Sequence, residues 1–505
     1  MKWIIKHLIA TIVILFFTNV TTFSKTNYVS LTGNDTLGNG TETNPWRTLN
    51  YTISKVSTGD VIYVSSGNYN EVLTLNKASV IIDGQGVVQT KRVNISAKDV
   101  ILRGFFLGKG NWDGWHDGAV IRVLAGADNS KIQSSTIFSQ AGKNQYGVSW
   151  ISGNVTGVTI SNCVISNFGP QSVCFVLNGT NTKILNNNII NNPQAEAAFY
   201  IWGISNIISG NVISDLNEVG GGGGHPDIFQ TFPNNTPSYG HLIENNLIEN
   251  NTCQLGSLQS SSDGNTNGAT KIDSRIRNWT FRNNLFIRIG SKLDVSIPEV
   301  KFYNNTFYDC GNYSDAPHVI NFNHSKYGLA TNCVVSRNIF VLCGSTPENS
   351  SKGWYCVDDP YGSLVRNSLT INSNIIAGAN FAMKNTNLVG NFPGMRNGFD
   401  PVFSYGPGVR RKIALTGTTK INNSTNLFGT NTLFTKELIV GDYIMLGPIF
   451  TNNITMVTSI INDTNILVSV PIGNGTTKNI LRMQKFDPKF NLKINSPDII
   501  PGAIQ

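Results

Sequence analysis

A short pattern of apolar and polar positions recurs through the middle of the chain. It runs apolar, polar, variable, Asn, apolar, apolar, and its copies span 185–190, 208–213, 243–248, 281–286, 302–307, 335–340 and 371–376, after an imperfect copy at 160–165. The apolar residues alternate with polar ones, which is the period of a β-strand and not of a helix. A unit of about 22 residues plus variable loops cannot bury its apolar face alone, so the repeat predicts a solenoid of stacked turns.

The asparagines of the repeat predict the bends between strands. Asn tolerates left-handed backbone angles and forms hydrogen bonds with neighbouring backbone groups. In stacked turns these side chains would align into a ladder of amides, which is an architectural role and not a catalytic one. The aligned asparagines are Asn188, Asn211, Asn246, Asn284, Asn305, Asn338 and Asn374.

A second series of short strand-like segments lies between the asparagine bends. The segments span 119–124, 148–152, 173–177, 198–202, 227–231, 254–258, 294–297, 319–322 and 355–357. Two or three strands per turn, wound in one direction, make a parallel β-helix, and the general handedness of parallel connections makes it right-handed. The predicted fold class is therefore all-β, a right-handed parallel β-helix of about ten turns.

The N-terminal part of the chain contains several small motifs in a fixed order. They are Tyr28-Val-Ser-Leu-Thr-Gly-Asn-Asp35, then Asn44-Pro-Trp-Arg-Thr-Leu49, then a Gly59-Asp60 segment that runs to Glu71. This order resembles the opening of secreted right-handed β-helix proteins of the pectate-lyase-like superfamily. The resemblance implies a short capping helix at about 45–56 and a first turn that begins at Gly59-Asp60. It covers roughly residues 27–405 and implies a fold, not a chemistry.

The composition changes near Gly406, where short strand-like segments follow one another at 8–12-residue spacing. The region 406–485 predicts a small β-barrel or sandwich, and it resembles an all-β module of bacterial surface and phage tail proteins. The tail that begins near 486 resembles the usual end of the β-helix family. We therefore expect a β-helix with its cap at 25–405, an inserted module at 406–485 and the end segment of the β-helix at 486–505.

Composition and charge narrow the classes of function. Only 13% of residues are charged and 40% are hydrophobic, which excludes a disordered chain and a coiled coil. Residues 1–24 have a basic start, a short apolar run and small residues at the end, which is the layout of a secretory signal peptide. The sequence therefore predicts a secreted or cell-surface protein with no stable membrane span after cleavage.

Partners and cysteines follow from the same counts. The net charge of +8 mildly favours an acidic polymer as partner, and no basic block indicates nucleic acid. None of the seven cysteines has CxxC spacing, so a zinc site is not predicted, and several are expected to be small buried residues. The oligomeric state is not indicated by the sequence.

Candidate chemistry concentrates after the glycine run 220–224. A glycine run gives the backbone freedom and removes side-chain bulk beside a cleft. The polar residues that follow over three turns are His225, Asp227, Gln230, Gln254, Gln259, Lys271, Asp273, Arg275 and Arg277. Cleaving a uronate polymer by β-elimination needs a base, a cation for the developing enolate and an acid for the leaving oxygen.

These residue types can be assigned to those roles. His225 or Lys271 is the candidate base, Arg275 or Arg277 the candidate carboxylate clamp, and Asp227 an orienting group or a ligand of Ca²⁺. Gln230, Gln254 and Gln259 are expected to bind substrate.

Two further groups leave alternatives open. Asp227 with Asp263 or Asp294 would instead supply the carboxylate pair of a glycoside hydrolase. Trp115 and Arg122 belong to a candidate sugar-binding loop and strand. The polygalacturonase motifs Asn-Thr-Asp-Gly, Gly-His-Gly and Arg-Ile-Lys are not present in order, which argues against a pectin hydrolase.

The leading hypothesis is a secreted, polysaccharide-active β-helix protein, a lyase that cleaves an acidic glycan, with Ca²⁺ as the candidate cofactor. The alternatives are a non-catalytic adhesin or glycan-binding protein, a glycoside hydrolase, and a tailspike-like protein.

Overall fold

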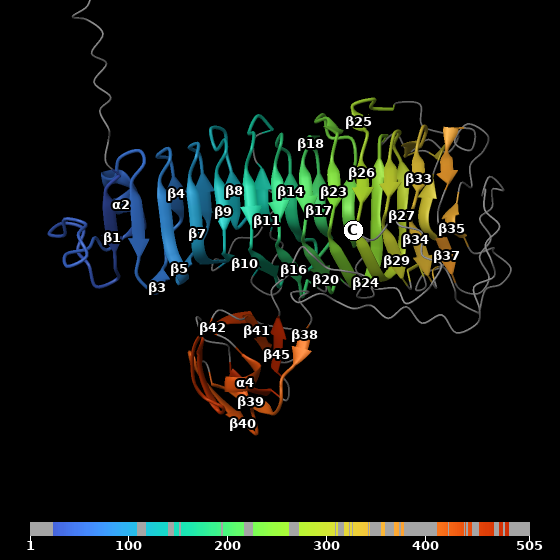
Figure 1. The fold of residues 1–505 in the computed structure, drawn as a ribbon. Helices are drawn as coiled ribbons and strands as arrows, with labels where there is room; N and C mark the ends of the chain where they lie inside the picture. Colours follow the sequence, from blue (N-terminus) through green and yellow to red (C-terminus); the bar gives the residue numbers. More distant parts are fainter. Residues whose placement is uncertain are drawn as a thin grey trace, which may run out of the picture.

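The computed structural model forms a long solenoid of parallel strands and a smaller antiparallel module near the C-terminus (Figure 1). The residues that it describes are 24–108, 118–139, 146–150, 153–192, 195–216, 226–261, 272–308, 310–311, 318–322, 324–325, 327–341, 343, 355–358, 368–372, 375–377, 412–422, 424–438, 440, 443–446, 454–468, 474–477 and 480–483. The predicted signal peptide, apart from Ser24, lies outside these residues.

Each turn of the solenoid contributes one strand to each of three parallel ladders, numbered here in the order in which the chain meets them. Ladder 1 contains β1 (Thr26–Val29), β2 (Val61–Val64), the start of β5 (Ile81–Thr90), the start of β7 (Ile101–Leu107), β9 (Lys131–Gln133), β12 (Thr159–Ser161), β15 (Lys183–Leu185), β19 (Ile207–Ser209), β23 (Leu242–Glu244), β26 (Thr280–Arg282), β28 (Lys301–Tyr303), β33 (Val334–Ser336) and β36 (Thr370–Asn372).

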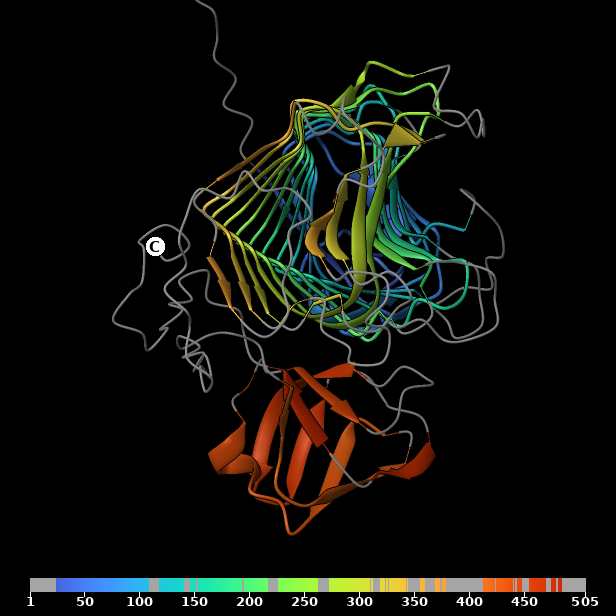
Figure 2. The ribbon, with the colours of Figure 1, turned by 90° about the vertical axis from the view of Figure 1, so that its right-hand side faces the viewer.

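Ladder 2 contains β3 (Gly67–Tyr69), the ends of β5 and β7, β10 (Thr136–Phe138), β13 (Val164–Ser166), β16 (Asn188–Ile190), β20 (Val212–Ser214), the start of β24 (Leu247–Gln259), the start of β27 (Leu285–Ser296), β29 (Thr306–Tyr308), β34 (Ile339–Val341) and β37 (Ile375–Ala377). Ladder 3 contains β4 (Leu73–Leu75), β6 (Val93–Ile95), β8 (Ile121–Val123), β11 (Tyr146–Trp150), β14 (Val173–Leu177), β17 (Ala197–Ile201), β21 (Asp227–Thr231), the ends of β24 and β27, β30 (His318–Phe322) and β35 (Tyr355–Asp358). Figure 2 looks along the solenoid and shows its sides around a common core. The predicted right-handed parallel β-helix is the fold of this chain.

Identical or similar side chains stack on successive rungs of the core. On ladder 3, the rings of Phe175, Phe199 and Phe229 follow one another with centroids 5.1 and 5.6 Å apart. On ladder 2, the Phe286 and Phe307 rings stack at 4.6 Å. Because the ladders run in register, every rung buries the same positions, and the turns share one continuous core.

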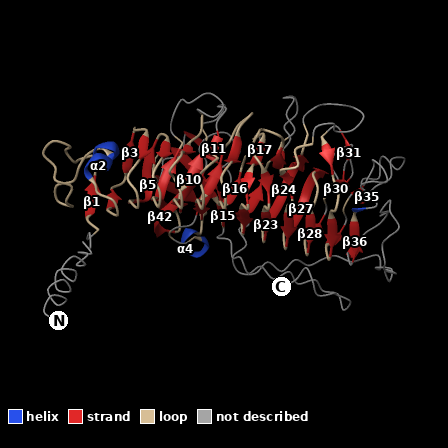
Figure 3. Cartoon of the chain, turned by 90° about the horizontal axis from the view of Figure 1, so that it is seen from above, coloured by secondary structure: helices blue, strands red, loops and turns tan. Residues whose placement is uncertain are grey.

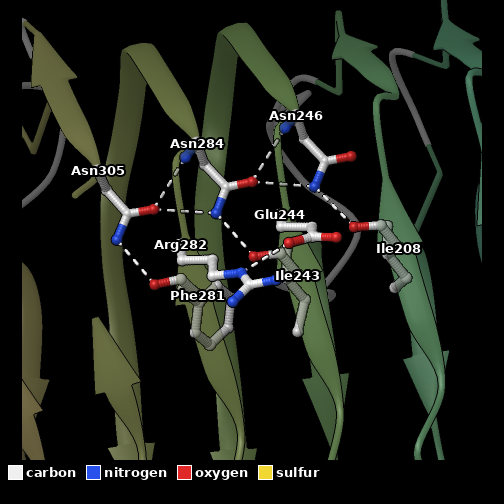
Figure 4. Close-up of polar contacts among 8 residues, drawn as sticks. All are labelled: Ile208, Ile243, Glu244, Asn246, Phe281, Arg282, Asn284 and Asn305. Atoms are coloured by element: carbon white, nitrogen blue, oxygen red, sulfur yellow. Dashed lines mark hydrogen bonds and ion pairs between the residues drawn. The ribbon is translucent and has the colours of Figure 1, made fainter. Parts of the chain in front are cut away.

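The bends between ladders 1 and 2 explain the sequence repeat. Each bend has two residues, and the first has a positive φ, for example 55° at Asn245 and 54° at Asn283, which Asn tolerates better than most residues. In the bends from Asn187 to Asn305, the second residue is a buried asparagine whose side chain donates from Nδ2 to Oδ1 of the asparagine on the next rung. The distance is 3.0 Å from Asn211 to Asn246. It is 2.9 Å from Asn246 to Asn284 and 2.9 Å from Asn284 to Asn305 (Figure 4).

One residue of the predicted ladder of amides was wrong by one position. Asn187, not Asn188, donates to Oδ1 of Asn211 at 3.0 Å, because β16 begins at Asn188, which pairs with Val212 on ladder 2. The expected position Asn374 lies outside the described residues.

A short helix lies at the N-terminal end of the solenoid. Helix α2 (Leu49–Lys55) buries Leu49 and Ile53 against the core, so the apolar end of the first turns is covered. Three two-residue strands form a short parallel ladder at the corner after ladder 3, and a small antiparallel pair lies near the C-terminal turns. They are β18 (Gly203–Ile204), β22 (Ser238–Tyr239) and β25 (Ile276–Arg277), and β31 (His324–Ser325) with β32 (Gly328–Leu329).

The C-terminal module is an antiparallel sheet with its own small core, which includes Leu427, Phe434 and Ile466. Its strands pair in the order β38, β45, β41, β42, β43, β40, β39, β44. The elements are β38 (Lys412–Ala414), β39 (Thr418–Asn422), β40 (Asn426–Thr430), α4 (Phe434–Glu437), β41 (Tyr443–Leu446), β42 (Ile454–Asn462), β43 (Asn465–Val468), β44 (Asn474–Thr477) and β45 (Ile480–Met483). The first and last strands are neighbours, so the chain enters and leaves the module side by side.

Cysteines and hydrophobic helices add little to the functional picture. Six cysteines in the described part of the chain are buried free thiols, and burial raises the pKa of Cys163 to about 12, so this thiol is a packing residue and not a nucleophile. Among the described residues, no helix is long and apolar enough to cross a membrane.

Candidate functional site

The outer face of ladder 3 carries the polar residues that the sequence singled out. Two neighbouring rows of side chains run along this face, outside the phenylalanine stack. One row is Arg122, Ser149, Val176, Tyr200, Gln230, Ser257, Asp294 and Asn321. The other is Tyr146, Val173, Ala197, Asp227, Gln254 and Ser291. The register therefore brings residues that are far apart in sequence onto one surface, called the ladder 3 face below.

Asp227 is a buried acid in this face. Its side chain is 2% exposed, and its Oδ1 atom has no hydrogen-bond partner. Burial, followed by the nearby charges of Asp294 and Glu196, raises the pKa of Asp227 well above its usual value. An unpaired carboxylate is costly to bury, so burial favours the protonated form of this group. Asp227 is therefore a candidate proton donor in an enclosed position.

Tyr200 and Glu196 form a second proton-donating pair next to Asp227. The Tyr200 hydroxyl donates to Oε1 of Glu196 at 2.5 Å. Burial and this hydrogen bond raise the pKa of Tyr200. Burial, followed by the charge of Glu196, raises the pKa of Tyr146 to about 12. Both tyrosines are thus neutral hydroxyl donors at physiological pH.

Asp294 lies two strands from Asp227 and has different partners. The Lys292 ammonium contacts its Oδ1 at 3.1 Å, and Asn321 donates to the same oxygen at 2.6 Å. One carboxyl group of the face thus has a cation and an amide donor, while Asp227 has a free oxygen. The two carboxyl groups of the face therefore differ in their partners.

Aromatic side chains lie beside the acids. Tyr200, Trp202 and Phe232 pack edge to face, with ring centroids between 4.9 and 5.8 Å apart, and the Trp202 indole donates to the Phe232 carbonyl at 2.7 Å. This cluster belongs to the outer face and is separate from the main core. Tyr200 and Trp202 therefore lie on the outer side of the sheet and not in the main core.

Several predicted site residues lie on this face. Gln254 pairs with Asp227 in register, Gln230 with Tyr200, and Arg122 with Ser149. Gln259 lies at the end of β24 and donates from Nε2 to the Ser257 hydroxyl at 2.9 Å. The glutamines are partly exposed, so their amides are available to hydroxyl-bearing ligands.

The two predicted arginine clamps lie elsewhere, at the corner between ladders 3 and 1. Arg275 is held by its own turn, since its Nε and Nη2 atoms donate to Asp273 at 2.9 and 2.7 Å. Arg277 is exposed, lies 3.7 Å from a Glu299 oxygen and covers the Tyr239 ring. In this arrangement neither guanidinium joins Asp227 and Asp294. Their roles as clamps stay predictions.

His225, Lys271, Asp263 and Trp115 lie outside the described residues, so the structure does not place the candidate bases or the sugar-binding tryptophan. In the sequence, the segments that contain them directly precede or follow strands of ladder 3.

A calcium ion is not supported by the residues described. Among them, no three His, Cys, Asp or Glu side chains gather as metal ligands. Asp227 with a raised pKa is a poor ligand for Ca²⁺, which prefers ionised carboxylates. No step is therefore assigned to calcium.

Sequence reasoning missed Glu196, Tyr146 and Lys292. Glu196 directly precedes β17, and Lys292 lies on β27 two positions before Asp294. Only the pairing of the strands places these residues on the ladder 3 face. The sequence does not show that pairing, because loops of different lengths separate the rungs.

No protein-family model and no curated protein sequence matches the chain. Among solved structures, a pectate lyase is 13% identical, with 62% of this chain and 79% of that chain covered and a TM-score of 0.45. The Dettilon tailspike protein is 13% identical, with 92% and 95% covered and a TM-score of 0.48. An alginate lyase is 14% identical, with 70% and 52% covered and a TM-score of 0.45. At these identities the likeness concerns the fold and says nothing of the chemistry.

Proposed function

We propose that the protein is a secreted enzyme that cleaves a polysaccharide on the ladder 3 face. The observation that carries this proposal is the buried Asp227, which has a raised pKa and an unpartnered oxygen between Glu196 and Asp294. Breaking a glycosidic bond by hydrolysis or by elimination needs an acid for the leaving oxygen. Asp227 fits that role, and the Tyr200 hydroxyl, which donates to Glu196, lies near it.

The shape of the face favours a polymer over a small molecule. Its eleven strands, from β4 to β35, at a spacing of about 4.8 Å span roughly 48 Å. Gln230, Gln254 and Asp294 are partly exposed on it, and their amide and carboxyl groups suit the hydroxyl groups of sugar rings. Export, predicted from residues 1–24, is consistent with an extracellular polymer.

Of the two cleavage reactions, the described residues favour hydrolysis. Hydrolysis uses one protonated and one ionised carboxyl group across the scissile bond. Asp227 supplies the first, and Asp294 or Glu196 supplies the second. The other two acids, Glu196 and Asp294, also repel the carboxylates of a polyuronate, so a neutral or weakly charged glycan suits this part of the face.

The β-elimination of an acidic glycan is the second candidate. It is favoured by Lys292, a cation next to Asp294 on the same face, and by the candidate bases His225 and Lys271 that flank ladder 3 in sequence. In that reaction Lys292 would bind the substrate carboxylate, and Asp227 would protonate the leaving oxygen.

A panel of neutral and uronate-containing glycans tests both candidates with two readouts. New reducing ends without ultraviolet absorbance indicate hydrolysis, and new ends with the absorbance of an unsaturated product indicate elimination. Binding with no new ends on any glycan would overturn the enzymatic proposal and leave a non-catalytic glycan-binding protein or adhesin.

A further inference from the structure

Two cysteines occupy equivalent positions on adjacent rungs near the C-terminal end of the solenoid. They are Cys310, which follows β29, and Cys343, which follows β34. Strands β29 and β34 lie side by side (Figure 1) and pair in register up to Tyr308 and Val341. Each cysteine comes two residues after that last pair. The register of the strands therefore stacks one cysteine on the other at the corner after ladder 2.

The hydrogen bonds of the two thiols confirm this stacking. The Cys310 thiol donates to the Phe286 carbonyl at 3.5 Å. The Cys343 thiol donates to the Phe307 carbonyl at 3.4 Å. Because Phe286 and Phe307 are register partners on β27 and β29, the second hydrogen bond repeats the first one rung later. Both side chains thus point the same way, and both belong to the main core, with exposed fractions of 1% and 0%.

The spacing of these rungs suits a disulfide bond. Residues paired between neighbouring strands lie about 4.8 Å apart. The rings of Phe307 and Phe340, on the same two strands, stack with centroids 4.8 Å apart and planes 4° from parallel, so the register is tight here. A disulfide needs Cα atoms about 4.4–6.8 Å apart and Cβ atoms on the same side. Stacked positions on adjacent rungs meet both conditions.

We propose that Cys310 and Cys343 form a disulfide bond when the chain folds in an oxidising environment. The structure shows both as thiols, and a second disulfide, such as glutathione disulfide or a protein disulfide, is the oxidant. One cysteine thiolate attacks the oxidant and forms a mixed disulfide, and the other thiolate then attacks the cysteine sulfur of that bond. The chain gains one S–S bond, both thiols lose their protons, and the two electrons reduce the oxidant to two thiols.

Burial decides when this exchange takes place. An oxidant cannot reach thiols enclosed in the core, so the bond forms before the turns close and resists reductants afterwards. Export, predicted from residues 1–24, would place folding in a compartment where disulfides form.

A matched control cysteine lies elsewhere in the same core. Cys174 is also fully buried, and the register places it between Gly147 and Ala198 on the neighbouring rungs. It has no cysteine beside it in its own column. Cys174 is therefore expected to stay a thiol under the conditions that oxidise the stacked pair.

The bond would fix the turn that carries one end of the ladder 3 face. The segment between the two cysteines contains β30, which pairs with β27 on one side and β35 on the other (Figure 3). Asn321 on β30 donates to Asp294 at 2.6 Å. Because a disulfide restricts the unfolded chain, it would stabilise this turn. The bond is independent of any reaction on ladder 3 and is tested without a substrate.

Thiol counting in the wild-type chain is the first test. The chain, produced with a secretion signal so that it folds in an oxidising compartment, is unfolded in denaturant that contains an alkylating reagent. Of its seven cysteines, we expect five to be alkylated without prior reduction and all seven after reduction. Mass spectrometry should find Cys310 and Cys343 in one linked peptide that separates on reduction. Seven alkylated thiols in both samples, or a link between other cysteines, would overturn the proposal, and no variant has to fold.

Alanine variants are the second test. In the oxidised protein, Cys310→Ala, Cys343→Ala and the double variant should all melt a few degrees below the wild type. The three losses should be similar, because each variant lacks the same bond. The loss should shrink when all proteins are produced under reducing conditions, whereas the effect of Cys174→Ala should be the same in both preparations. Losses that add in the double variant, or that do not depend on the oxidant, would contradict a shared bond.

Discussion

The outer faces of ladders 1 and 3 share one core and one rung spacing, yet their charged side chains differ in exposure and in partners. On ladder 1, acids meet bases on the next rung in water: Arg103 contacts Asp83 at 2.7 Å, and Arg282 contacts Glu244 at 2.6 Å. On ladder 3, Asp227 is buried with an unpartnered oxygen. Exposed ion pairs contribute little to stability, whereas a buried unpaired acid destabilises the folded state. The difference indicates that ladder 1 is a solvated surface. Ladder 3 keeps a destabilising buried acid, which is typical of a functional site.

The largest expected effect is on turnover. Asp227→Asn removes the transferable proton but keeps the size of the side chain, so we expect cleavage of the responsive glycan to fall about 10²- to 10⁴-fold. The measurement is kcat/KM from new reducing ends.

Asp83→Asn is the matched control, since it removes one carboxylate from the ladder 1 face. It should leave kcat/KM unchanged. Similar losses in both variants would show that the two faces do not differ as argued, and an active Asp227→Asn enzyme would remove Asp227 from the mechanism.

The next largest effect is on stability, in the ladder of stacked asparagine side chains. The Asn284 side chain takes part in four hydrogen bonds, with the backbone and side chain of Asn246, with the Ile243 carbonyl and with Asn305. Asn284→Ala would leave these buried groups unpaired, so the free energy of unfolding should fall by about 3–4 kcal/mol. Denaturant titration followed by circular dichroism measures the loss.

The neighbouring residue provides the control for that loss. Asn283 is exposed and has a φ of 54°, which glycine adopts without strain. Asn283→Gly should therefore be close to neutral. A large loss in this variant would mean that the first residue of the bend, and not the buried amide, carries the stability.

Much of the fold followed from the sequence because the repeat has a simple physical cause. Strand alternation and asparagine at the bends both recur with every turn, so the strand series at 173–177 and 227–231 agrees with β14 and β21. The error at Asn188 has an equally simple cause. Three successive asparagines at 186–188 fit the pattern in two registers, and only the pairing of Asn187 with Asn211 selects one.

The candidate site was predictable only in part. Asp227 and its glutamines stood out because polar residues occupied strand positions where other rungs are apolar. Glu196 and Lys292 did not, since each is an ordinary charged residue near the end of a strand or loop. Glu196 comes close to Asp227, and Lys292 to Asp294, through the register of β17, β21, β24 and β27, which loops of unequal length conceal in the sequence.

A third prediction concerns the pH dependence of stability. Because burial raises the Asp227 pKa above that of the unfolded chain, its contribution to stability is fully present below about pH 4, the unfolded value, and is lost as the pH rises toward the folded pKa. Asn does not titrate. Asp227→Asn should therefore melt at nearly the wild-type temperature at about pH 4 and a few degrees higher at about pH 8. A melting difference that does not change with pH would contradict the buried-acid interpretation, and Asp83→Asn should show no such rise.

The smallest expected effect is on ladder 1. Arg282 is half exposed and pairs with Glu244 across one rung (Figure 4), so a double-mutant cycle with Arg282→Ala and Glu244→Ala should give a coupling of about 0–1 kcal/mol that weakens with added salt. The reason is that both groups keep most of their hydration and lose side-chain entropy when they pair. Arg282 lies two residues from Asn284 on the same rung. The cycle therefore compares the stability contributed by an exposed ion pair with that of a buried amide, which is expected to be several-fold larger. A coupling above about 2 kcal/mol would mean that the ladder 1 face is not the weakly held, solvated surface inferred from its exposure, and the contrast with ladder 3 would then depend on burial of Asp227 alone.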